Sequence, residues 1–196
     1  MSRSVAVIDY GAGNLGNARR AVRELGFQES LVRGPEDLPD DGVILLPGVG
    51  AYGAAAATLR ARGLDGAIAD WALLGGEIVG ICLGLQLLFG ASEESEDVRG
   101  LGVLPGTVRR LRTAGRPLPH LGWAPVEPDG TPYYFAHSFR VVPDHPEMVT
   151  GTARWGEEFP AAVRAGSVSG FQFHPERSGR PGLDLLGRAL RGERVP

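Results

Sequence analysis

The chain has 196 residues, 43% of them hydrophobic, and a formal net charge of −3 at neutral pH. This length predicts one domain over residues 1–196, and the charge gives no argument for nucleic acid or a membrane as partner. There is no signal-peptide pattern or membrane-spanning run, and a single cysteine excludes a disulfide framework and fits a reducing cytoplasm. Every basic residue is arginine, which excludes a Walker phosphate loop and Schiff-base chemistry.

The first half of the chain alternates short apolar runs with helical patterns. Asn14 is expected to cap the first helix, and Gly26 to end it. Alternating strands and helices favour a mostly parallel sheet covered on both faces. The pattern predicts strands at 4–9, 31–32, 43–46 and 77–81, and helices at 14–25, 54–62, 64–74 and 85–89.

The second half changes character, because apolar segments are joined there by turns. A strand at 169–173 and a helix at 181–190 bring back the alternation. The predicted fold is therefore α/β, with a mostly parallel central sheet, helices on both faces and an antiparallel extension. The extension is predicted to contain strands at 107–111, 123–126, 133–139 and 162–164.

The only cysteine stands between glycines in residues 80–84, Gly-Ile-Cys-Leu-Gly, where a predicted strand runs into a helix. Glycines on both sides of a nucleophile allow a tight, strained turn that lifts its side chain off the end of a sheet. The N-terminus of the following helix favours the thiolate of Cys82, which can attack a carbonyl. The alternative interpretation is a small core residue, which is the usual role of a lone cysteine in an apolar run.

A histidine and a carboxylate follow ninety-two residues later, in His174-Pro175-Glu176. His174 closes an apolar strand, where functional loops collect, and Pro175 stiffens the step to a carboxylate that could orient the imidazole. A surface turn is the alternative for this tripeptide alone. Together with Cys82, it indicates a nucleophile with an acid–base relay.

Residues 11–16 read Gly-Ala-Gly-Asn-Leu-Gly, a literal G-x-G-x-x-G between a strand and a helix. This motif occurs in dinucleotide-binding folds, and Arg33 could be taken as contacting a 2′-phosphate. The bulky step at Asp9 and Tyr10, and the lack of a second nucleotide-binding half, argue against a cofactor. The glycines are instead expected to let a surface loop lie flat against another body.

Over its full length the chain resembles class I glutamine amidotransferases of the triad type, with their flavodoxin-like fold. Within that class it resembles the glutaminase subunits of imidazole glycerol phosphate synthase. The segments that carry the resemblance are 8–14 (Ile-Asp-Tyr-Gly-Ala-Gly-Asn), 47–50 (Pro-Gly-Val-Gly), 80–86 (Gly-Ile-Cys-Leu-Gly-Leu-Gln), 100–106 (Gly-Leu-Gly-Val-Leu-Pro-Gly), 119–123 (Pro-His-Leu-Gly-Trp) and 171–176 (Phe-Gln-Phe-His-Pro-Glu).

The resemblance implies that Cys82 attacks the side-chain amide of glutamine and forms a γ-glutamyl thioester. His174 would move the protons, and Glu176 would fix the imidazole tautomer. The oxyanion would be bound by backbone N–H groups of Leu83 and of the 47–50 loop, which contains Gly48, Val49 and Gly50, with Val49 as the expected donor. Because a Gly-Val-Gly segment can reorient a peptide plane, this loop is a candidate activation switch.

By the same resemblance, glutamine would contact Gln86, Ser138 and Phe139, with Gly50 beneath it. Gln86 could otherwise be a solvent-facing helix residue, but it lies one helical turn past Cys82. Ser138 could otherwise be an ordinary strand hydroxyl. No cofactor and no metal are expected.

The resemblance also implies a partner, a (β/α)₈-barrel cyclase subunit that receives ammonia in a heterodimer of histidine biosynthesis. The candidate interface residues are Asn14, Trp123, Tyr134 and Arg177, although Trp123 could equally be core. His120 falls in the interface-like segment, and no chemistry is assigned to His137 or His145. Two departures from the family pattern fall near this surface: Ala124 replaces asparagine, and Arg-Ser-Gly at 177–179 replaces Lys-Ser-Ser.

Two other classes of function stay open from the sequence. The chain could be the glutaminase of another enzyme, such as pyridoxal phosphate synthase, or a thiol redox sensor with the same corner. The acid–base relay at His174 and Glu176 argues against a sensor, which needs only a reactive thiol.

Overall fold

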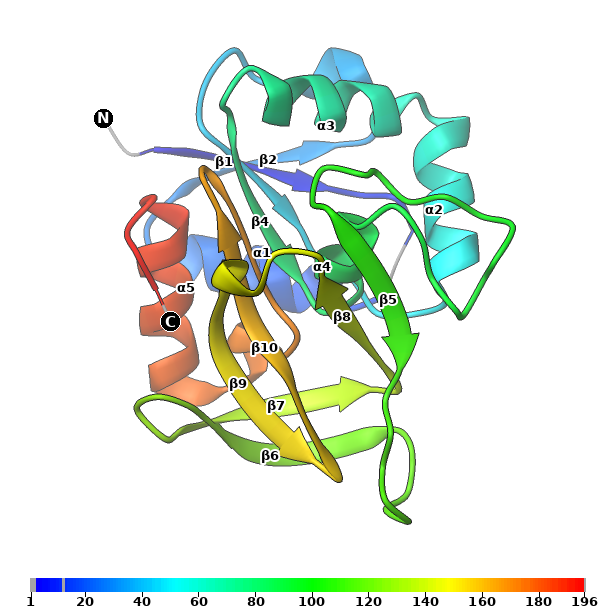
Figure 1. The fold of residues 1–196 in the computed structure, drawn as a ribbon. Helices are drawn as coiled ribbons and strands as arrows, with labels where there is room; N and C mark the ends of the chain where they lie inside the picture. The colour runs from blue at the N-terminus through cyan, green and yellow to red at the C-terminus, as the bar shows by residue number, and fades with distance from the viewer. Residues whose placement is uncertain (1–2, 12, 196) are drawn as a thin grey trace.

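The computed structural model describes residues 3–11 and 13–195 (Figure 1). Ala12 of the glycine motif lies outside the described residues. A seven-stranded sheet runs through the molecule in the order β2-β1-β3-β4-β11-β10-β9. Its strands are β1 (Ser4–Ile8), β2 (Gln28–Val32), β3 (Val43–Leu46), β4 (Glu77–Ile81), β9 (Val149–Trp155), β10 (Glu157–Ala165) and β11 (Val168–Phe171).

The first five strands of this order pair in parallel, and β10 and β9 continue the sheet in antiparallel pairing. Parallel strands covered on both faces are apolar throughout, and all four residues of β3 are buried. The carboxyl ends of β4 and β11 adjoin, since Ile81 pairs with Phe171. This register brings the cysteine corner and the histidine turn to the same edge of the sheet.

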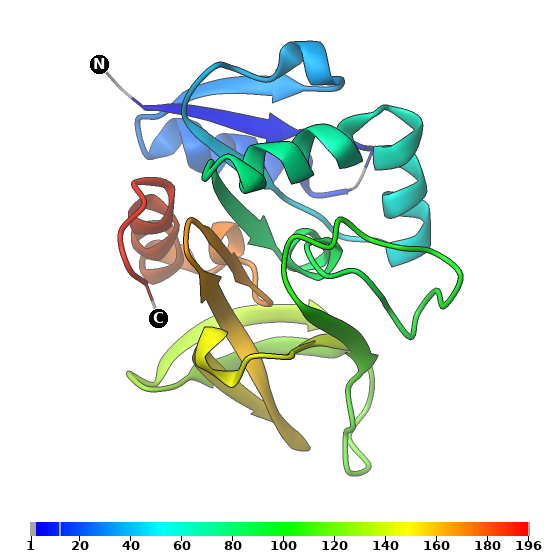
Figure 2. The same cartoon turned by 45° about the horizontal axis from the view of Figure 1, so that its top comes forward.

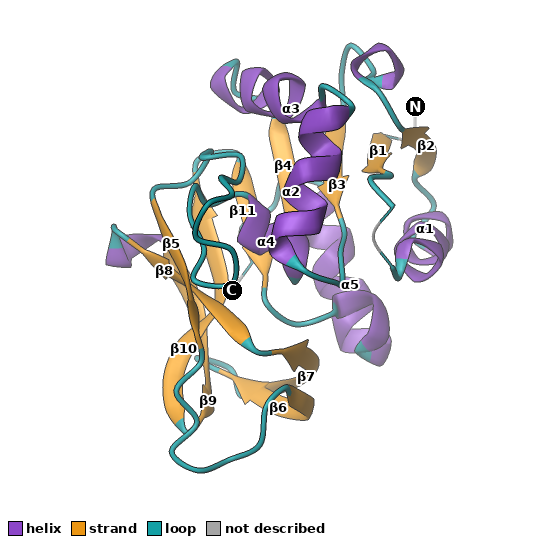
Figure 3. Ribbon diagram, turned by 90° about the vertical axis from the view of Figure 1, so that its right-hand side faces the viewer, coloured by secondary structure: helices purple, strands orange, loops and turns teal. Residues whose placement is uncertain are grey.

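Helices cover both faces of the sheet (Figure 3). The alternating side chains of β1 show the two layers: Val5 and Val7 pack in the core formed with α1 and α5, whereas Ala6 and Ile8 pack with α2 and α3. The expected α/β class is thereby confirmed. The helices are α1 (Leu15–Glu24), α2 (Tyr52–Ala61), α3 (Leu64–Leu73), α4 (Leu83–Leu87) and α5 (Gly179–Leu190), with 3₁₀ turns η1 (Pro35–Asp37), η2 (Pro146–Met148) and η3 (Pro175–Arg177).

The antiparallel extension forms the lower part of the molecule in Figure 2. It contains two further pairs of strands, β5 (Gly106–Arg110) with β8 (Phe139–Pro143), and β6 (His120–Val126) with β7 (Thr131–His137). The β6–β7 hairpin is joined to β9 through a bridge between Glu127 and Thr152. This hairpin lies beside the histidine turn, because His174 and Tyr134 share a backbone hydrogen bond.

The extension differs from the expectation in three places. The single strand predicted at 133–139 divides at Ser138 into β7 and β8, which pair in different sheets. Strand β9 was not predicted, and the strand predicted at 162–164 is the end of the nine-residue β10. In each case the pairing partner defines the strand, and a partner distant in sequence leaves no local signal.

His120 was expected in a partner-facing segment, but it is fully buried. Its ring stacks between Phe135 and Trp155, with ring centroids 4.7 Å and 4.3 Å away. Burial, together with the charge of Arg116, lowers the pKa of His120 to about 4, so the ring stays neutral at physiological pH. His120 is therefore part of the core beneath the hairpin.

Candidate active site

Cys82 occupies the sharp corner between β4 and α4, as the glycine pattern predicted. Its backbone adopts φ 53° and ψ −106°, a conformation that non-glycine residues avoid, and its N–H donates to the Phe171 carbonyl at 2.7 Å. The corner needs Gly84, because a Cβ there would lie 1.7 Å from the Leu46 carbonyl oxygen. Close packing thus holds the nucleophile in a strained conformation.

His174 and Glu176 follow β11 and meet Cys82 across the sheet edge. His174 Nδ1 lies 2.8 Å from Glu176 Oε1, and the two side chains are 0% and 1% exposed. Burial by itself lowers the pKa of His174, but the Cys82 sulfur, by charge and hydrogen bonding, and then Glu176 raise it above its ordinary value. Apart from the Cys82 sulfur, Nε2 has no partner among the described residues, so it is the ring nitrogen available to the thiol.

Ser178 connects the histidine turn to the β6–β7 hairpin. Its hydroxyl donates to the His174 carbonyl at 2.7 Å and accepts the Tyr134 N–H at 2.9 Å. The His174 N–H donates in turn to the Tyr134 carbonyl at 2.8 Å. The position of the imidazole therefore depends on three hydrogen bonds to a single strand and the residue after the turn.

Asn14 does not cap α1 with its side chain, so that expectation was wrong. It is left-handed, at φ 69°, and its side-chain Nδ2 donates to Glu176 Oε1. Asn17 Nδ2 donates to Asn14 Oδ1 at 2.5 Å. The loop after β1 thus contacts the carboxylate that orients His174.

The loop after β3 lies over the start of α4, where the oxyanion is expected. The Tyr10 hydroxyl donates to the Pro47 carbonyl at 2.6 Å, and the Leu83 N–H donates to the Gly48 carbonyl at 3.3 Å. Burial, and then the charge of Cys82, raise the pKa of Tyr10, so the phenol stays protonated. One expected oxyanion donor is therefore occupied by a carbonyl of its own chain.

A pocket of about 190 Å³ opens beside Cys82. Of the residues expected to bind glutamine or the oxyanion, all except Gly48 line it. Gly48 lies behind the pocket wall, where a Cβ would meet the Tyr10 hydroxyl at 2.1 Å. The lining is Val49, Gly50, Cys82, Leu83, Gln86, Glu94, Pro119, Ala136, His137, Ser138 and Phe139.

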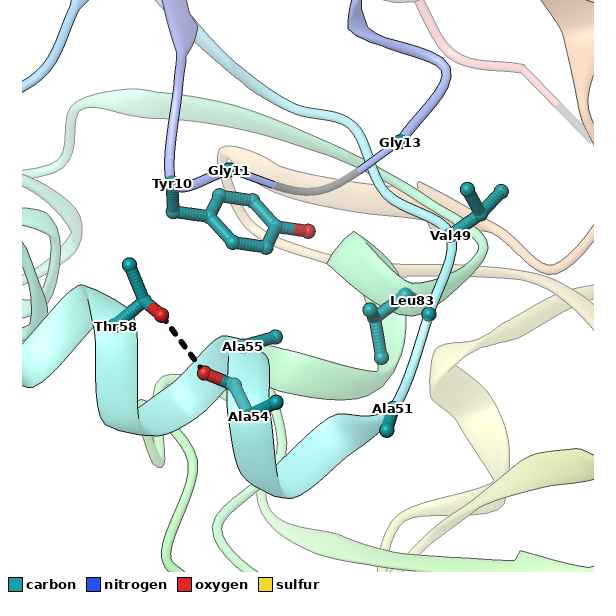
Figure 4. A pocket seen from close by; sticks show the side chains of 10 residues that line it. Tyr10, Gly11, Gly13, Val49, Ala51, Ala54, Ala55, Thr58 and Leu83 are labelled. Atoms are coloured by element: carbon teal, nitrogen blue, oxygen red, sulfur yellow. Dashed lines mark hydrogen bonds between the residues drawn. The ribbon is translucent and has the colours of Figure 1, made fainter.

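On its other side the same wall faces a second hollow, of about 150 Å³, shown in Figure 4. Val49, Gly50 and Leu83 line both cavities. Figure 4 shows the ring of Tyr10 inside this hollow, between the glycine loop and α2. The oxyanion loop is therefore a thin partition with space on both sides.

Sequence reasoning missed Glu94, His137 and Gln172. Glu94 is a carboxylate in the pocket lining and accepts the Tyr52 N–H at 3.0 Å. His137 is buried with Nδ1 2.8 Å from the Phe139 carbonyl, and burial lowers its pKa to about 3. Gln172 Nε2 lies 3.7 Å from the Cys82 sulfur. Only Gln172 had a sequence signal, as a polar residue between Phe171 and Phe173.

The four expected interface residues do not all share one environment. Trp123 is 57% exposed, which excludes the core alternative, and its ring meets Tyr134 edge-on at 6.1 Å. The Arg177 guanidinium lies 4.4 Å from the centre of the Tyr134 ring. We call the surface formed by Leu121, Trp123, Tyr134 and Arg177 the hairpin face; Asn14 makes its contact with Glu176 instead.

Among residues 3–11 and 13–195, no cluster of three or more His, Cys, Asp or Glu side chains could hold a metal ion. Over the same residues, no helix is long and apolar enough to cross a membrane.

Comparison with known proteins identifies the family of this chain. Residues 6–189 match the family model described as glutamine amidotransferase class-I. Curated relatives named imidazole glycerol phosphate synthase subunit HisH come from Moorella thermoacetica (44% identical, covering 94% of this chain and 92% of the relative) and Methanopyrus kandleri (44%, 96% and 98%). The chain also matches Arabidopsis thaliana imidazole glycerol phosphate synthase hisHF, chloroplastic, at 39% identity, over 95% of this chain and 34% of that protein.

Two solved structures share the fold. One is described as a crystal structure of glutamine amidotransferase, with a TM-score of 0.75 and 25% identity over 96% of this chain and 98% of that chain. The other is PurLQS from Thermotoga maritima, with a TM-score of 0.77 and 26% identity over 97% and 99%. The expected glutamine amidotransferase activity is confirmed by these matches. The chain belongs to the class I glutamine amidotransferases and, within them, to the HisH subunits of imidazole glycerol phosphate synthase.

Proposed function

We propose that this chain is the glutaminase subunit of imidazole glycerol phosphate synthase, acting in the cytoplasm as one domain over residues 1–196. It would hydrolyse glutamine to glutamate and ammonia, and pass the ammonia to a cyclase subunit in histidine biosynthesis. The observation that carries the proposal is the buried Cys82, His174 and Glu176 group at the edge of a substrate-sized pocket.

The first half of the reaction forms a thioester. His174 Nε2 takes the thiol proton, and Sγ of Cys82 attacks the amide carbon of glutamine, which places negative charge on the amide oxygen. Collapse of this intermediate breaks the C–N bond, and the imidazolium gives its proton to the departing ammonia. Glu176 accepts the Nδ1–H, so the imidazole keeps the tautomer that leaves Nε2 free as a base.

Hydrolysis of the thioester completes the cycle. His174 takes a proton from water, whose oxygen attacks the thioester carbonyl, and the C–S bond breaks as glutamate forms. The Cys82 thiolate leaves and the proton returns to it from the imidazolium. Both halves develop charge on the same carbonyl oxygen, so both need the oxyanion donors of the 47–50 loop and Leu83.

The lining of the pocket suits glutamine. Glu94 supplies a carboxylate that can pair with the α-ammonium group of the substrate, and the Ser138 hydroxyl is a second polar group at the wall. The amide of the substrate would then point towards Cys82. This placement makes Glu94 a specificity residue for a free amino acid over a neutral amide.

The hydrogen bond between Leu83 and Gly48 describes a resting state. For Leu83 N–H to bind the oxyanion, the Gly48 carbonyl must turn away, and rotation of the Gly48–Val49 peptide would do this. Because one oxyanion donor contributes about 10²–10³-fold in rate, the resting loop would keep the subunit nearly inactive. Activation by the partner is then a loop rotation, a proposal that fails if the loop is unchanged in the active complex.

The hairpin face supports a protein partner. Leu121 and Trp123 are 61% and 57% exposed on adjacent outward positions of β6. Exposed aromatic and arginine side chains of this kind are typical of interface cores. We propose that the cyclase, a (β/α)₈ barrel, covers this face in a heterodimer and places its entrance near the triad.

Glutamate release tests the proposal, measured with and without a cyclase subunit and its nucleotide substrate, for wild type and Cys82→Ala. Strong release only in the full mixture, abolished in the variant, is the expected result. Release that is indifferent to this cyclase would assign the chain to another synthase. Release that survives Cys82→Ala would overturn the proposed nucleophile.

A further inference from the structure

Gln172 is an unusual residue in its position. It lies between Phe171 and Phe173 where β11 leads into the histidine turn, and its side chain is 0% exposed. A buried amide without partners is destabilising, so a glutamine at an otherwise apolar site needs a reason.

The partners of Gln172 fix the orientation of its amide. Gln86 Nε2 donates to the Phe139 carbonyl at 2.9 Å, which identifies that end of Gln86 as the nitrogen. The same nitrogen lies 3.1 Å from Gln172 Oε1, so the oxygen of Gln172 faces Gln86. The NH₂ group of Gln172 is then left facing the Cys82 sulfur, at 3.7 Å.

We propose that Gln172 is a further catalytic residue, whose side-chain N–H donates to the Cys82 sulfur and stabilises it as a thiolate. The inference rests on Cys82 being the nucleophile proposed above. Hydrogen bonds to a charged acceptor are about twice as strong as neutral ones, and burial excludes the water that would otherwise compete. The chain Phe139–Gln86–Gln172–Cys82 also connects the substrate pocket to the nucleophile.

The hydrogen bond acts at two points in the cycle. When His174 takes the thiol proton, the electron pair stays on sulfur, and the Gln172 N–H offsets the new charge. When the thioester breaks, the electron pair of the C–S bond returns to sulfur, and the same N–H stabilises the leaving group. Gln172 exchanges no proton and forms no covalent bond in either step.

Other groups also face the Cys82 sulfur, and their effects on the thiolate must be distinguished from the effect of Gln172. The Ala136 carbonyl lies 3.9 Å away and favours the protonated thiol, in the opposite sense to Gln172. His174 provides the opposing charge, and Tyr10 is close enough for the thiolate to raise the pKa of its phenol. His137 and Glu94 line the same pocket, with Glu176 behind His174.

The pH profile of alkylation by iodoacetamide tests the inference in the full-length chain. Cys82 is the only cysteine, so the reaction reports this sulfur whether or not the protein turns over glutamine. Gln172→Met removes the donor at similar volume, and Gln172→Glu keeps the shape but replaces the NH₂ with oxygen. The matched control is Gln28→Met, at the exposed start of β2.

We expect the midpoint of the alkylation profile to rise by about one pH unit in Gln172→Met. At a pH well below the midpoint, the variant would then contain about tenfold less thiolate than wild type. Gln172→Glu should raise it further, because a carboxylate would then face the sulfur, and Gln28→Met should match wild type. An unchanged midpoint in either folded variant, with folding checked by circular dichroism, would overturn the inference. Failure of the glutaminase proposal would appear separately, as activity that survives Cys82→Ala.

Discussion

Cys82 stands on a corner closed by packed glycines, whereas His174 and Glu176 stand on a turn that hydrogen bonds attach to the β6–β7 hairpin. The nucleophile side is fixed by sterics: Gly84 meets the Leu46 carbonyl, and Cys82 is held in a strained conformation. The base side is fixed by polar contacts with β7, a strand whose outward side chains, such as Tyr134, are partly exposed. Packing is rigid and hydrogen bonds are adjustable, so a partner on the hairpin face would shift the base, in addition to turning the oxyanion loop, and leave the Cys82 corner in place.

The largest effect should come from Gly84→Ala, which disturbs the close packing around the Cys82 corner. The new Cβ would lie 1.7 Å from a backbone oxygen, so the corner must move, and we expect a loss of about 3 kcal/mol or more in unfolding free energy. The control is Gly16→Ala in α1, where a Cβ meets nothing within 4 Å. Urea unfolding should show that control stabilised by about 0.5–1 kcal/mol. Equal stabilities for the two variants would contradict the steric account of the corner.

Ser178→Ala tests the base side, which is positioned by hydrogen bonds. It leaves the part-buried Tyr134 N–H without its acceptor and removes the donor to the His174 carbonyl. The imidazole is then held less precisely, so we expect about 1–3 kcal/mol less transition-state stabilisation. In steady-state kinetics this is a fall of about tenfold or more in kcat with little change in KM. Ser167→Ala is the control, because its hydroxyl bonds the Gly76 carbonyl at the other end of β11. If Ser167→Ala lost as much activity, the loss in Ser178→Ala would not come from the position of His174.

Glu176→Gln separates charge from shape on the base side. The pKa of His174 is raised in the folded chain, so the protonated imidazole stabilises the fold, fully so below the ordinary value of 6.5 and progressively less as pH rises through the raised pKa. The Glu176→Gln variant should lose part of this stabilisation of the fold by protonated His174. Wild type should therefore exceed Glu176→Gln in melting temperature most clearly at pH 6, with the gap narrowing towards high pH. A gap that widens with pH would contradict the assignment.

Arg177→Lys should have the smallest effect. It restores the family residue but exchanges a planar group stacked on Tyr134 for a point charge. Since the group is exposed, we expect glutaminase activity of the isolated subunit to be unchanged and the affinity for the cyclase to change by a few-fold. Titration calorimetry would measure this, with Arg154→Lys, an exposed arginine on β9, as the control.

The sequence could predict the elements that local patterns define, but not those that depend on contacts between distant segments. Strands β3 and β4 were predicted with their observed ends. The first is a continuous apolar run between Gly42 and Pro47, and the second lies between Gly76 and the Cys82 corner. Strand β9 contains small and polar residues, such as Gly151 and Thr152, which form a strand only beside β10. The corner and the His-Pro-Glu turn are local signals and were found. The contacts of Asn14 with Glu176 and of Gln172 with Cys82 join chain segments far apart in sequence and left no such signal.

The hydrogen bond between Tyr10 and Pro47 sets a limit on how the oxyanion loop can move. It fastens one end of the loop to the end of β1, and α2 begins at Tyr52 on the other side, so only the few residues between them are free to turn. A hinge this short moves a single peptide plane, with no displacement of a lid or domain. Such a local rotation belongs to fast backbone motion, so the rate at which the enzyme switches on would follow the arrival of its partner.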